Sequence, residues 1–342
     1  MKRCILLLLL VGVLIATAGL YVRSQLDVPG PGESTTVEIP RGLRARGVVD
    51  LLAQNNVIRN KYAALAYIFY SRTYNKLQAG EYMFDAHLTT REIVRKLTSG
   101  EVYLHKFTVA EGLTLKQTAQ KWEEQGFGTA EDFLQAASGA IDLVRNVDDK
   151  ASSVEGYLFP ETYSFPKGTT SRQAIASMID RFREMVARLK QMVPESSWPH
   201  DLHDTTIVAS LVESEAAHSE ERPIIASVYL NRLSRKILLQ CDPTVIYALD
   251  LANKYRGTLT LADLRFSSPY NTYVNPGLPP GPIMSPGYAS LVAAVQPAST
   301  NYLYFVRTQE GRHTFSETLA AHNRAVAAYR KLQQAAKRNS KG

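Results

Sequence analysis

Two glutamates separated by one residue, Glu213 and Glu215, stand in a segment that is otherwise typical of an apolar helix. On a helical wheel of about 100° per residue, Val208, Leu211 and Val212 form one stripe, and Glu215 falls on its centre line. A carboxyl group on an apolar stripe is costly to ionise, so its pKa should rise. A carboxylic acid with a raised pKa can donate a proton near neutral pH, as a general acid must.

The same pattern allows other interpretations of this helix. Glu213 points to the opposite side and is the second candidate acid. Glu215 could instead reach solvent at the end of the stripe or pair with Arg222, because structural ion pairs also perturb pKa values. Asp204 is placed to cap the start of the helix, since a short acidic side chain accepts hydrogen bonds from the first turn.

Candidate sugar-binding residues follow this helix. Tyrosine rings stack on sugar rings, and asparagine and glutamine amides can bind hydroxyl and acetamido groups. A long Tyr-, Asn- and Pro-rich region at 267–283 is either such a binding loop or a proline-stiffened structural loop. Asp242 could equally be a helix N-cap with Pro243 as the first helical residue. The predicted substrate contacts are Asn231, Gln240, Asp242, Tyr247, Tyr270, Asn271 and Tyr273.

A third carboxylate, Glu155, opens the segment EGYLFPETY, which combines aromatic residues with Glu161. Such a segment can plug a core or form the wall of a cleft, and the sequence does not choose between them. Glu155 is therefore a supporting candidate beside Glu215.

Composition limits the classes of function. The chain has 342 residues, 45% hydrophobic and 21% charged, which suits about two globular domains. Its net charge of +7 is spread along the chain, so a carboxylate-bearing polymer or polyanionic surface is favoured over nucleic acid. The two cysteines, Cys4 and Cys241, form no disulfide framework; Cys241 is either buried and inert or a nucleophile. No zinc-finger, EF-hand or HExxH spacing occurs, so we predict no metal and no cofactor.

The N-terminus carries an apolar run from Cys4 to Val22, and roughly 19 helical residues can span a hydrocarbon core of about 30 Å. Lys2 and Arg3 precede it, which predicts a cytoplasmic N-terminus and an exported body. The alternative is a cleaved signal peptide. We predict an anchor at 1–23 and a Pro/Gly/Ser linker at 24–36.

The remaining chain predicts an α+β fold in two parts. Residues 37–101 have the order strand, helix, helix, strand and third helix, typical of a small binding module. Residues 102–335 predict a larger mixed α/β domain with Glu215 on a helix, followed by a polar tail at 336–342. The expected elements are strands at 35–39, 80–84 and 302–307 and helices at 44–55, 62–74, 89–100 and 171–192.

Several motifs, in order, resemble the MltG-type (YceG-like) endolytic murein transglycosylase family. They are EGYLFPETY, VESEAAHSEERPIIASVYLNRL, LQCDPTVIYAL, SPYNTY, GLPPGPI, SPG, YLYFV and HTFSETLAAHN. The resemblance implies a bacterial single-pass inner-membrane protein with a periplasmic body, a LysM-like module at 37–101 and a catalytic domain. It also implies peptidoglycan strands as substrate and peptidoglycan synthases as partners. In the family the second Glu of Glu-x-Glu is the acid, which corresponds to Glu215. Ser214 and Cys241 depart from the residues common at their positions.

The family reaction is cleavage of the MurNAc–GlcNAc β-1,4 bond within nascent strands, leaving 1,6-anhydroMurNAc ends and limiting strand elongation. One carboxyl group can serve as acid and then base, because the attacking hydroxyl belongs to the substrate. Two alternatives stay open. A hydrolase of the same bond would need a second carboxylate, from Glu213, Glu155 or Asp242. A non-catalytic glycan-binding scaffold would tolerate the loss of Glu215.

Overall fold

The structure is a computed structural model that describes residues 2–308 and 311–339. The chain divides into two units: Met1–Lys106 with Ser164–Gly168, here unit 1, and Phe107–Tyr163 with Thr169–Gly342, here unit 2. The predicted boundary after residue 101 lies shortly before this division. The described residues combine helices with three two-stranded sheets, so the coarse α+β prediction is confirmed.

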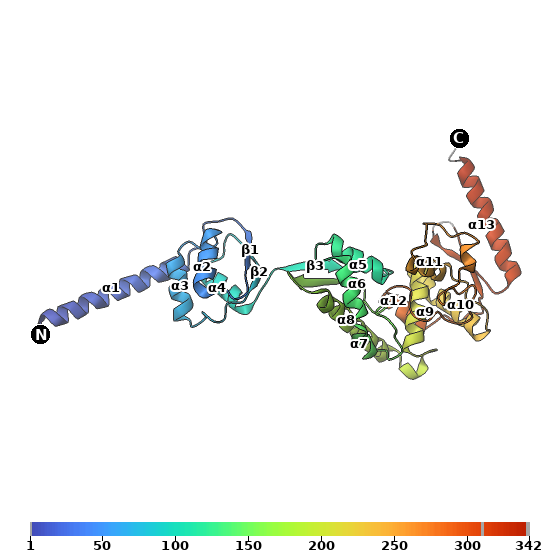
Figure 1. The fold of residues 1–342 in the computed structure, drawn as a ribbon, viewed down its shortest axis with the longest axis horizontal. Helices are drawn as coiled ribbons and strands as arrows, with labels where there is room; N and C mark the ends of the chain where they lie inside the picture. The colour runs from blue at the N-terminus through green and yellow to red at the C-terminus, as the bar shows by residue number, and fades with distance from the viewer. Residues whose placement is uncertain (1, 309–310, 340–342) are drawn as a thin grey trace. The chain divides into compact units, whose positions relative to one another are not determined.

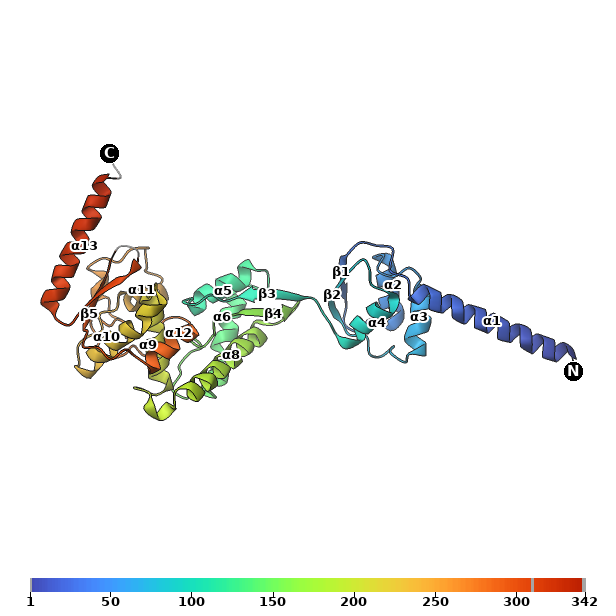
Figure 2. The ribbon, with the colours of Figure 1, turned by 180° about the vertical axis from the view of Figure 1, so that it is seen from behind.

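Unit 1 begins with the long apolar helix α1, in which Ile5–Leu26 is long and apolar enough to cross a membrane. Its core has the predicted strand–helix–helix–strand order, with β1 and β2 paired antiparallel from Thr35↔Phe84 to Ile39↔Gly80. Figure 1 shows α3 beside the end of α1, and Figure 2 shows the same neighbours from behind. The elements are α1 (Lys2–Leu26), β1 (Thr35–Ile39), α2 (Ala45–Gln54), α3 (Lys61–Tyr70), β2 (Gly80–Phe84) and α4 (Thr90–Ser99).

Local signals explain where the helices of unit 1 begin and end. Helix α4 starts in a capping box between Thr89 and Glu92 and ends at Gly100, whose φ of 73° suits glycine. The helix predicted at 62–74 is shorter, because Ser71 bonds back to α3 and Arg72 turns the chain at a φ of 56°. The strands and helices enclose one apolar core that includes Val48, Leu52, Ile68, Tyr82 and Leu97.

Unit 2 is mainly helical. The chain leaves and re-enters unit 1 within the paired strands β3 and β4. The strands β5 and β6 form an antiparallel hairpin, from Tyr304↔Ser316 to Arg307↔His313. The α-helices and strands are β3 (Leu104–Thr108), α5 (Leu115–Glu124), α6 (Ala130–Ser138), α7 (Ile141–Arg145), β4 (Thr162–Pro166), α8 (Ser171–Met192), α9 (Leu202–Glu215), α10 (Arg222–Ser234), α11 (Asp242–Leu251), α12 (Tyr288–Val295), β5 (Tyr304–Arg307), β6 (His313–Ser316) and α13 (Leu319–Asn339). Short 3-10 turns lie at Glu195–Ser197, Ser219–Glu221 and Asp263–Arg265.

Helix α9 is the central helix of unit 2, packed against α10, α11 and α12. Every residue from Thr205 to Val212 is buried, including the two threonines at its start and Ser210. The hydroxyls of Thr206 and Ser210 are satisfied by backbone carbonyls of the same helix. The prediction from the helical wheel, that α9 buries a single apolar stripe, was therefore wrong, because this part of the helix is surrounded by protein on all sides.

Two predicted features near the C-terminus differ from the structure. The strand expected at 302–307 begins at Tyr304 and is only half-buried. The hairpin that it forms with β6 packs mainly against one helix, α13. Helix α13 continues to Asn339, into the predicted polar tail at 336–342; residues 340–342 lie outside the described residues.

Candidate active site

The start of α9 is held by its N-cap. Asp201, not Asp204 as predicted, caps the helix: its carboxylate accepts the backbone N–H of Asp204 at 3.0 Å. Asp201 also pairs with Lys150. The helix therefore starts at Leu202, earlier than the sequence suggested.

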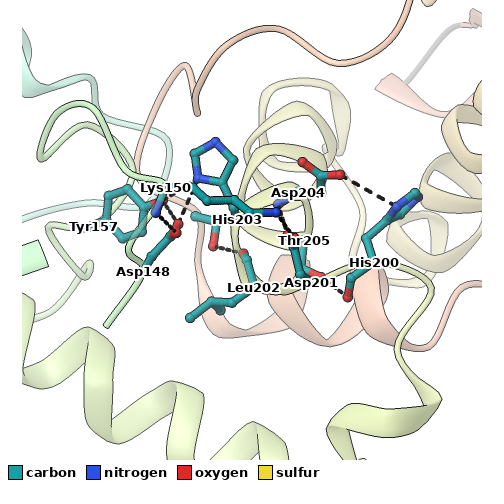
Figure 3. A network of polar contacts seen from close by, with 10 residues as sticks. Asp148, Lys150, Tyr157, His200, Asp201, Leu202, His203, Asp204 and Thr205 are labelled. Atoms are coloured by element: carbon teal, nitrogen blue, oxygen red, sulfur yellow. Dashed lines mark hydrogen bonds and ion pairs between the residues drawn. The ribbon is translucent and has the colours of Figure 1, made fainter. Parts of the chain in front are cut away.

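A buried polar cluster holds the first turn of α9 from the side (Figure 3). Nδ1 of His203 lies 2.8 Å from Oδ2 of Asp148, and the hydroxyl of Tyr157 donates to the same carboxylate oxygen. Because Asp148 and Tyr157 come from the segment between α7 and β4, these contacts fix α9 to the rest of unit 2. Glu215 is the last residue of the same helix.

The carboxyl group of Glu215 has few polar partners. Its Oε1 lies 3.8 Å from Sγ of Cys241, and that sulfur accepts the hydroxyl of Tyr229 at 3.2 Å. Both partners are almost fully buried, and burial raises the pKa of the Cys241 thiol well above its usual value. The interpretation of Cys241 as a buried, inert thiol fits this environment.

Burial raises the pKa of Glu215 to about 7, and repulsion by the nearby Asp242 carboxylate adds to the shift. The thiol of Cys241 and the guanidinium of Arg307 act in the opposite direction with smaller effects. The position at the C-terminal end of α9 also disfavours the anion, because the helix dipole is negative there. Near neutral pH, Glu215 is thus available as a proton donor.

Glu215 opens into a cleft with a volume of about 460 Å³. Of the predicted substrate contacts, Gln240, Asp242 and Tyr273 line this cleft. The alternative prediction, that Asp242 is the N-cap of α11, is wrong, because Asp242 is the first residue of that helix. Its carboxylate accepts a hydrogen bond from the hydroxyl of Tyr273. Ser214 also lines the cleft and returns its hydroxyl to the carbonyl of Leu211.

Another part of the cleft lining comes from residues that the sequence analysis did not predict as site residues. The guanidinium of Arg232 donates to the carbonyls of Leu303 and Leu239 and lies 5.1 Å from the ring of Tyr304. The ring of His322 stacks on the ring of Tyr304, with 5.3 Å between their centroids. Its Nδ1 has no hydrogen-bond partner within the described part of the chain, and burial next to Arg232 lowers the pKa of its imidazole.

The β5–β6 hairpin brings two further groups to this part of the lining. Arg307 stands at the end of β5, and His313 opens β6 with its ring nitrogen 2.8 Å from Oε2 of Glu221. These residues fall within or beside the quoted motifs YLYFV and HTFSETLAAHN. The motifs signalled the region, but only the fold shows which side chains face the cleft.

Glu213 has a different environment. Its carboxylate accepts from the Arg222 guanidinium at 3.1 Å and from the backbone N–H of Gly287 at 2.9 Å. Arg222 therefore pairs with Glu213 and not with Glu215. Since both side chains are nearly buried, this ion pair holds α9, α10 and the start of α12 together.

Glu155 lines a second pocket with Tyr247, Lys116 and Asp250, and it is not among the residues of the cleft. Its carboxyl accepts the backbone N–H of Leu115 at 2.9 Å and the hydroxyl of Tyr247 at 3.1 Å. Burial raises its pKa to about 7 despite these bonds. Glu155 thus holds the start of α5 against α11.

The remaining predicted contacts lie outside the cleft. Tyr247 lines the second pocket, and the ring of Tyr270 packs edge-on against it, with 4.9 Å between the ring centroids. The amide of Asn231 donates to the carbonyls of Thr300 and Tyr302. The fully buried amide of Asn271 donates to the carbonyls of residues 264 and 266. These bonds shape loops, so a sugar contact by Asn231, Asn271, Tyr247 or Tyr270 stays a prediction without support from the geometry.

Comparisons with known proteins identify relatives over most of the chain. A sequence profile of the YceG-like family matches residues 37–328. A Bacillus subtilis endolytic murein transglycosylase is 34% identical over 333 residues, covering 92% of this chain and 91% of the relative. A Streptococcus pneumoniae endolytic murein transglycosylase is 32% identical, and the match spans 58% of its length. The crystal structure of a YceG-like protein from Listeria monocytogenes has a TM-score of 0.58 and 32% identity, covering 86% of this chain and 99% of that one.

Proposed function

The chain belongs to the YceG-like family, and on that premise we infer that it is an endolytic murein transglycosylase, a lyase that acts on peptidoglycan. The single observation that supports a mechanism is the partly buried carboxyl of Glu215, which has a pKa of about 7 and lines a cleft. We propose that this residue is the catalytic acid.

The proposed reaction cleaves the β-1,4 bond between N-acetylmuramic acid and N-acetylglucosamine. Glu215 donates its proton to the bridging oxygen as the bond from that oxygen to C1 of the muramyl residue breaks. The C6 hydroxyl of the same ring attacks C1, and its proton passes to the Glu215 carboxylate. The products are a free 4-hydroxyl and a 1,6-anhydro end, no water is consumed, and Glu215 regains its proton.

The cleft residues support this reaction in distinct ways. The positive charge that develops at C1 is favoured by the carboxylate of Asp242, which the hydroxyl of Tyr273 orients. The amide of Gln240 is placed to bind a sugar hydroxyl or acetamido group. Because nucleophile and electrophile share one sugar ring, the protein has only to hold that ring in a reactive conformation.

A hydrolase of the same bond is the second candidate, and Asp242 favours it, because a second carboxylate in the cleft could activate water. Mass spectrometry of strands digested by the full-length protein in detergent separates the two. We expect anhydromuramyl ends from the wild type and none from Glu215→Gln, with Glu155→Gln as a matched control that keeps activity. Reducing ends would make the enzyme a hydrolase, and full activity of Glu215→Gln would remove Glu215 as the acid.

For the rest of the chain we propose a bacterial inner-membrane location. Helix α1 supplies a single-pass anchor, with Lys2 and Arg3 on the cytoplasmic side and both units in the periplasm. The strand–helix–helix–strand core of unit 1 supports a LysM-like glycan-binding role. In this location the enzyme would act on nascent strands, limit their elongation and meet peptidoglycan synthases.

A further inference from the structure

Helix α3 of unit 1 is apolar on the side that faces away from its own core. Ala63, Ala64 and Ile68 are buried in unit 1, as expected of a core-facing side. The other side consists of Tyr62, Ala66, Phe69 and Tyr70, here called the aromatic face; Tyr62 is 74% exposed, Phe69 56% and Tyr70 88%. A helix that is apolar all round normally has an apolar environment on every side, either protein or lipid.

The aromatic face adjoins the helix that is apolar enough to cross a membrane. Helices α1 and α3 are in contact and lie side by side in Figures 1 and 2. Between them is a crevice of about 710 Å³. It is lined by Ala18, Gly19 and Val22 of α1 and by Ala66, Tyr67 and Tyr70 of α3.

The end of α1 and the residues that follow it are packed against the rest of unit 1 and do not form a free linker. Leu26 at the end of α1 is only 3% exposed, because it is packed within unit 1. Asp27 pairs with Arg91 of α4 at 2.6 Å, and Arg91 lies over the ring of Tyr67 at 5.1 Å. Pro29 bridges Thr89. The segment predicted as a linker at 24–36 is thus bound along much of its length, and α3 must lie at a set depth relative to α1.

That depth follows from the helix rise. A hydrocarbon core of about 30 Å takes up about 20 residues, so a span beginning at Ile5 reaches the far boundary near Ser24. Ala18 then lies about 9 Å inside this boundary. Tyr70 shares the crevice with Ala18 and Val22, inside this boundary, and with Leu26 and Asp27, just outside it, so Tyr70 lies close to the level of the boundary. Interfacial helices bury their apolar side by about 5–10 Å.

We propose that the aromatic face of α3 inserts into the phospholipid interface of the leaflet from which unit 1 emerges, so that α1 and α3 together anchor the protein. Tyrosine rings are favoured at that level of a bilayer. Arg23 lines the same crevice, where its guanidinium can meet lipid phosphates. The inference rests on the membrane anchor proposed above and adds a second contact with the bilayer.

The test uses the full-length protein in phosphatidylcholine–phosphatidylglycerol vesicles, in a Cys4→Ser background; Cys241 is buried and shielded from labelling. An environment-sensitive NBD fluorophore is attached at Tyr70→Cys or at the matched control Met83→Cys in β2. Met83 is 40% exposed, and its strand β2 lies away from most of α1 within unit 1 (Figure 1). Lipids carrying a spin label on the acyl chain quench only a fluorophore that enters the bilayer.

We expect the label at position 70 to be blue-shifted and quenched at least twofold more strongly by spin-labelled lipid than the label at position 83. Equal quenching at both positions, in vesicles from which alkaline carbonate does not extract the protein, would overturn the inference and leave the anchor standing. Extraction by carbonate would instead reject the anchor itself, and the inference with it. A signal at position 70 that responds to soluble glycan strands and not to lipid would assign the face to glycan and also overturn the proposal.

Discussion

Replacing Glu215 by glutamine should make unit 2 more stable while abolishing catalysis. The carboxyl has a pKa near 4.5 when the chain is unfolded and of about 7 in the folded protein. Between these values the folded state holds a proton that the unfolded state releases, so the stability of the wild type falls as the pH rises. A difference of this size corresponds to about 3 kcal/mol at pH 7 and above, and to almost nothing at pH 4.

Glutamine keeps the shape of the side chain and carries no charge, so Glu215→Gln escapes this penalty. We expect the variant to exceed the wild type by about 3 kcal/mol in free energy of unfolding at pH 8, and by a few tenths at pH 4. Urea titrations of both proteins at pH 4, 6 and 8 measure the difference, with the fluorescence of Trp122 and Trp198 reporting on unit 2. A difference that does not grow with pH would refute the argument that Glu215 is held in an environment that disfavours its anion.

Three further predictions concern the residues around this acid. Glu213→Gln should lower the free energy of unfolding by about 3 kcal/mol at pH 7, because it leaves a nearly buried arginine without its partner; the same urea titration measures this loss. Activity should fall above about pH 7 as Glu215 loses its proton. Cys241→Ser should move this fall to lower pH, because a hydroxyl donates a stronger hydrogen bond to the Glu215 carboxylate than a thiol does. If the pH–rate profiles of the variant and the wild type fall at the same pH, the thiol has no influence on the pKa of Glu215. Tyr273→Phe should reduce kcat/KM by about tenfold or more, because it removes the hydrogen bond to Asp242, and unchanged kinetics would exclude that orienting role.

The sequence was informative where local chemistry decides structure. The capping box at Thr89 and Glu92 and the glycine at position 100 marked both ends of α4, and helix α8 has the predicted bounds. The raised pKa of Glu215 was also predicted, but the apolar stripe from which it was predicted is only part of its cause. The wheel assumed a helix with one buried stripe, whereas α9 is buried all round and Glu215 owes its environment to Cys241, Tyr229 and the residues of the cleft.

Contacts between distant segments could not be predicted from composition. The cleft needs β5 to pack against α10 and α13, which brings Arg307 and His322 into the same cleft as Glu215. Asparagine in a loop can equally bind a sugar or a backbone carbonyl. Asn231 and Asn271 bond to carbonyls, and only the folded chain shows where these acceptors lie.

A raised pKa alone does not identify the catalytic acid in this protein. Burial raises the pKa of Glu155 and of Glu215 to the same value of about 7. Glu155, however, accepts a backbone N–H and a tyrosine hydroxyl, so its oxygens are occupied in holding α5 against α11. Glu215 has a weak thiol donor at 3.8 Å and opens into a cleft that also contains Asp242 and Tyr273. A group that must give and take a proton needs a free oxygen facing the substrate, and on that criterion the geometry separates two carboxyls that titrate alike.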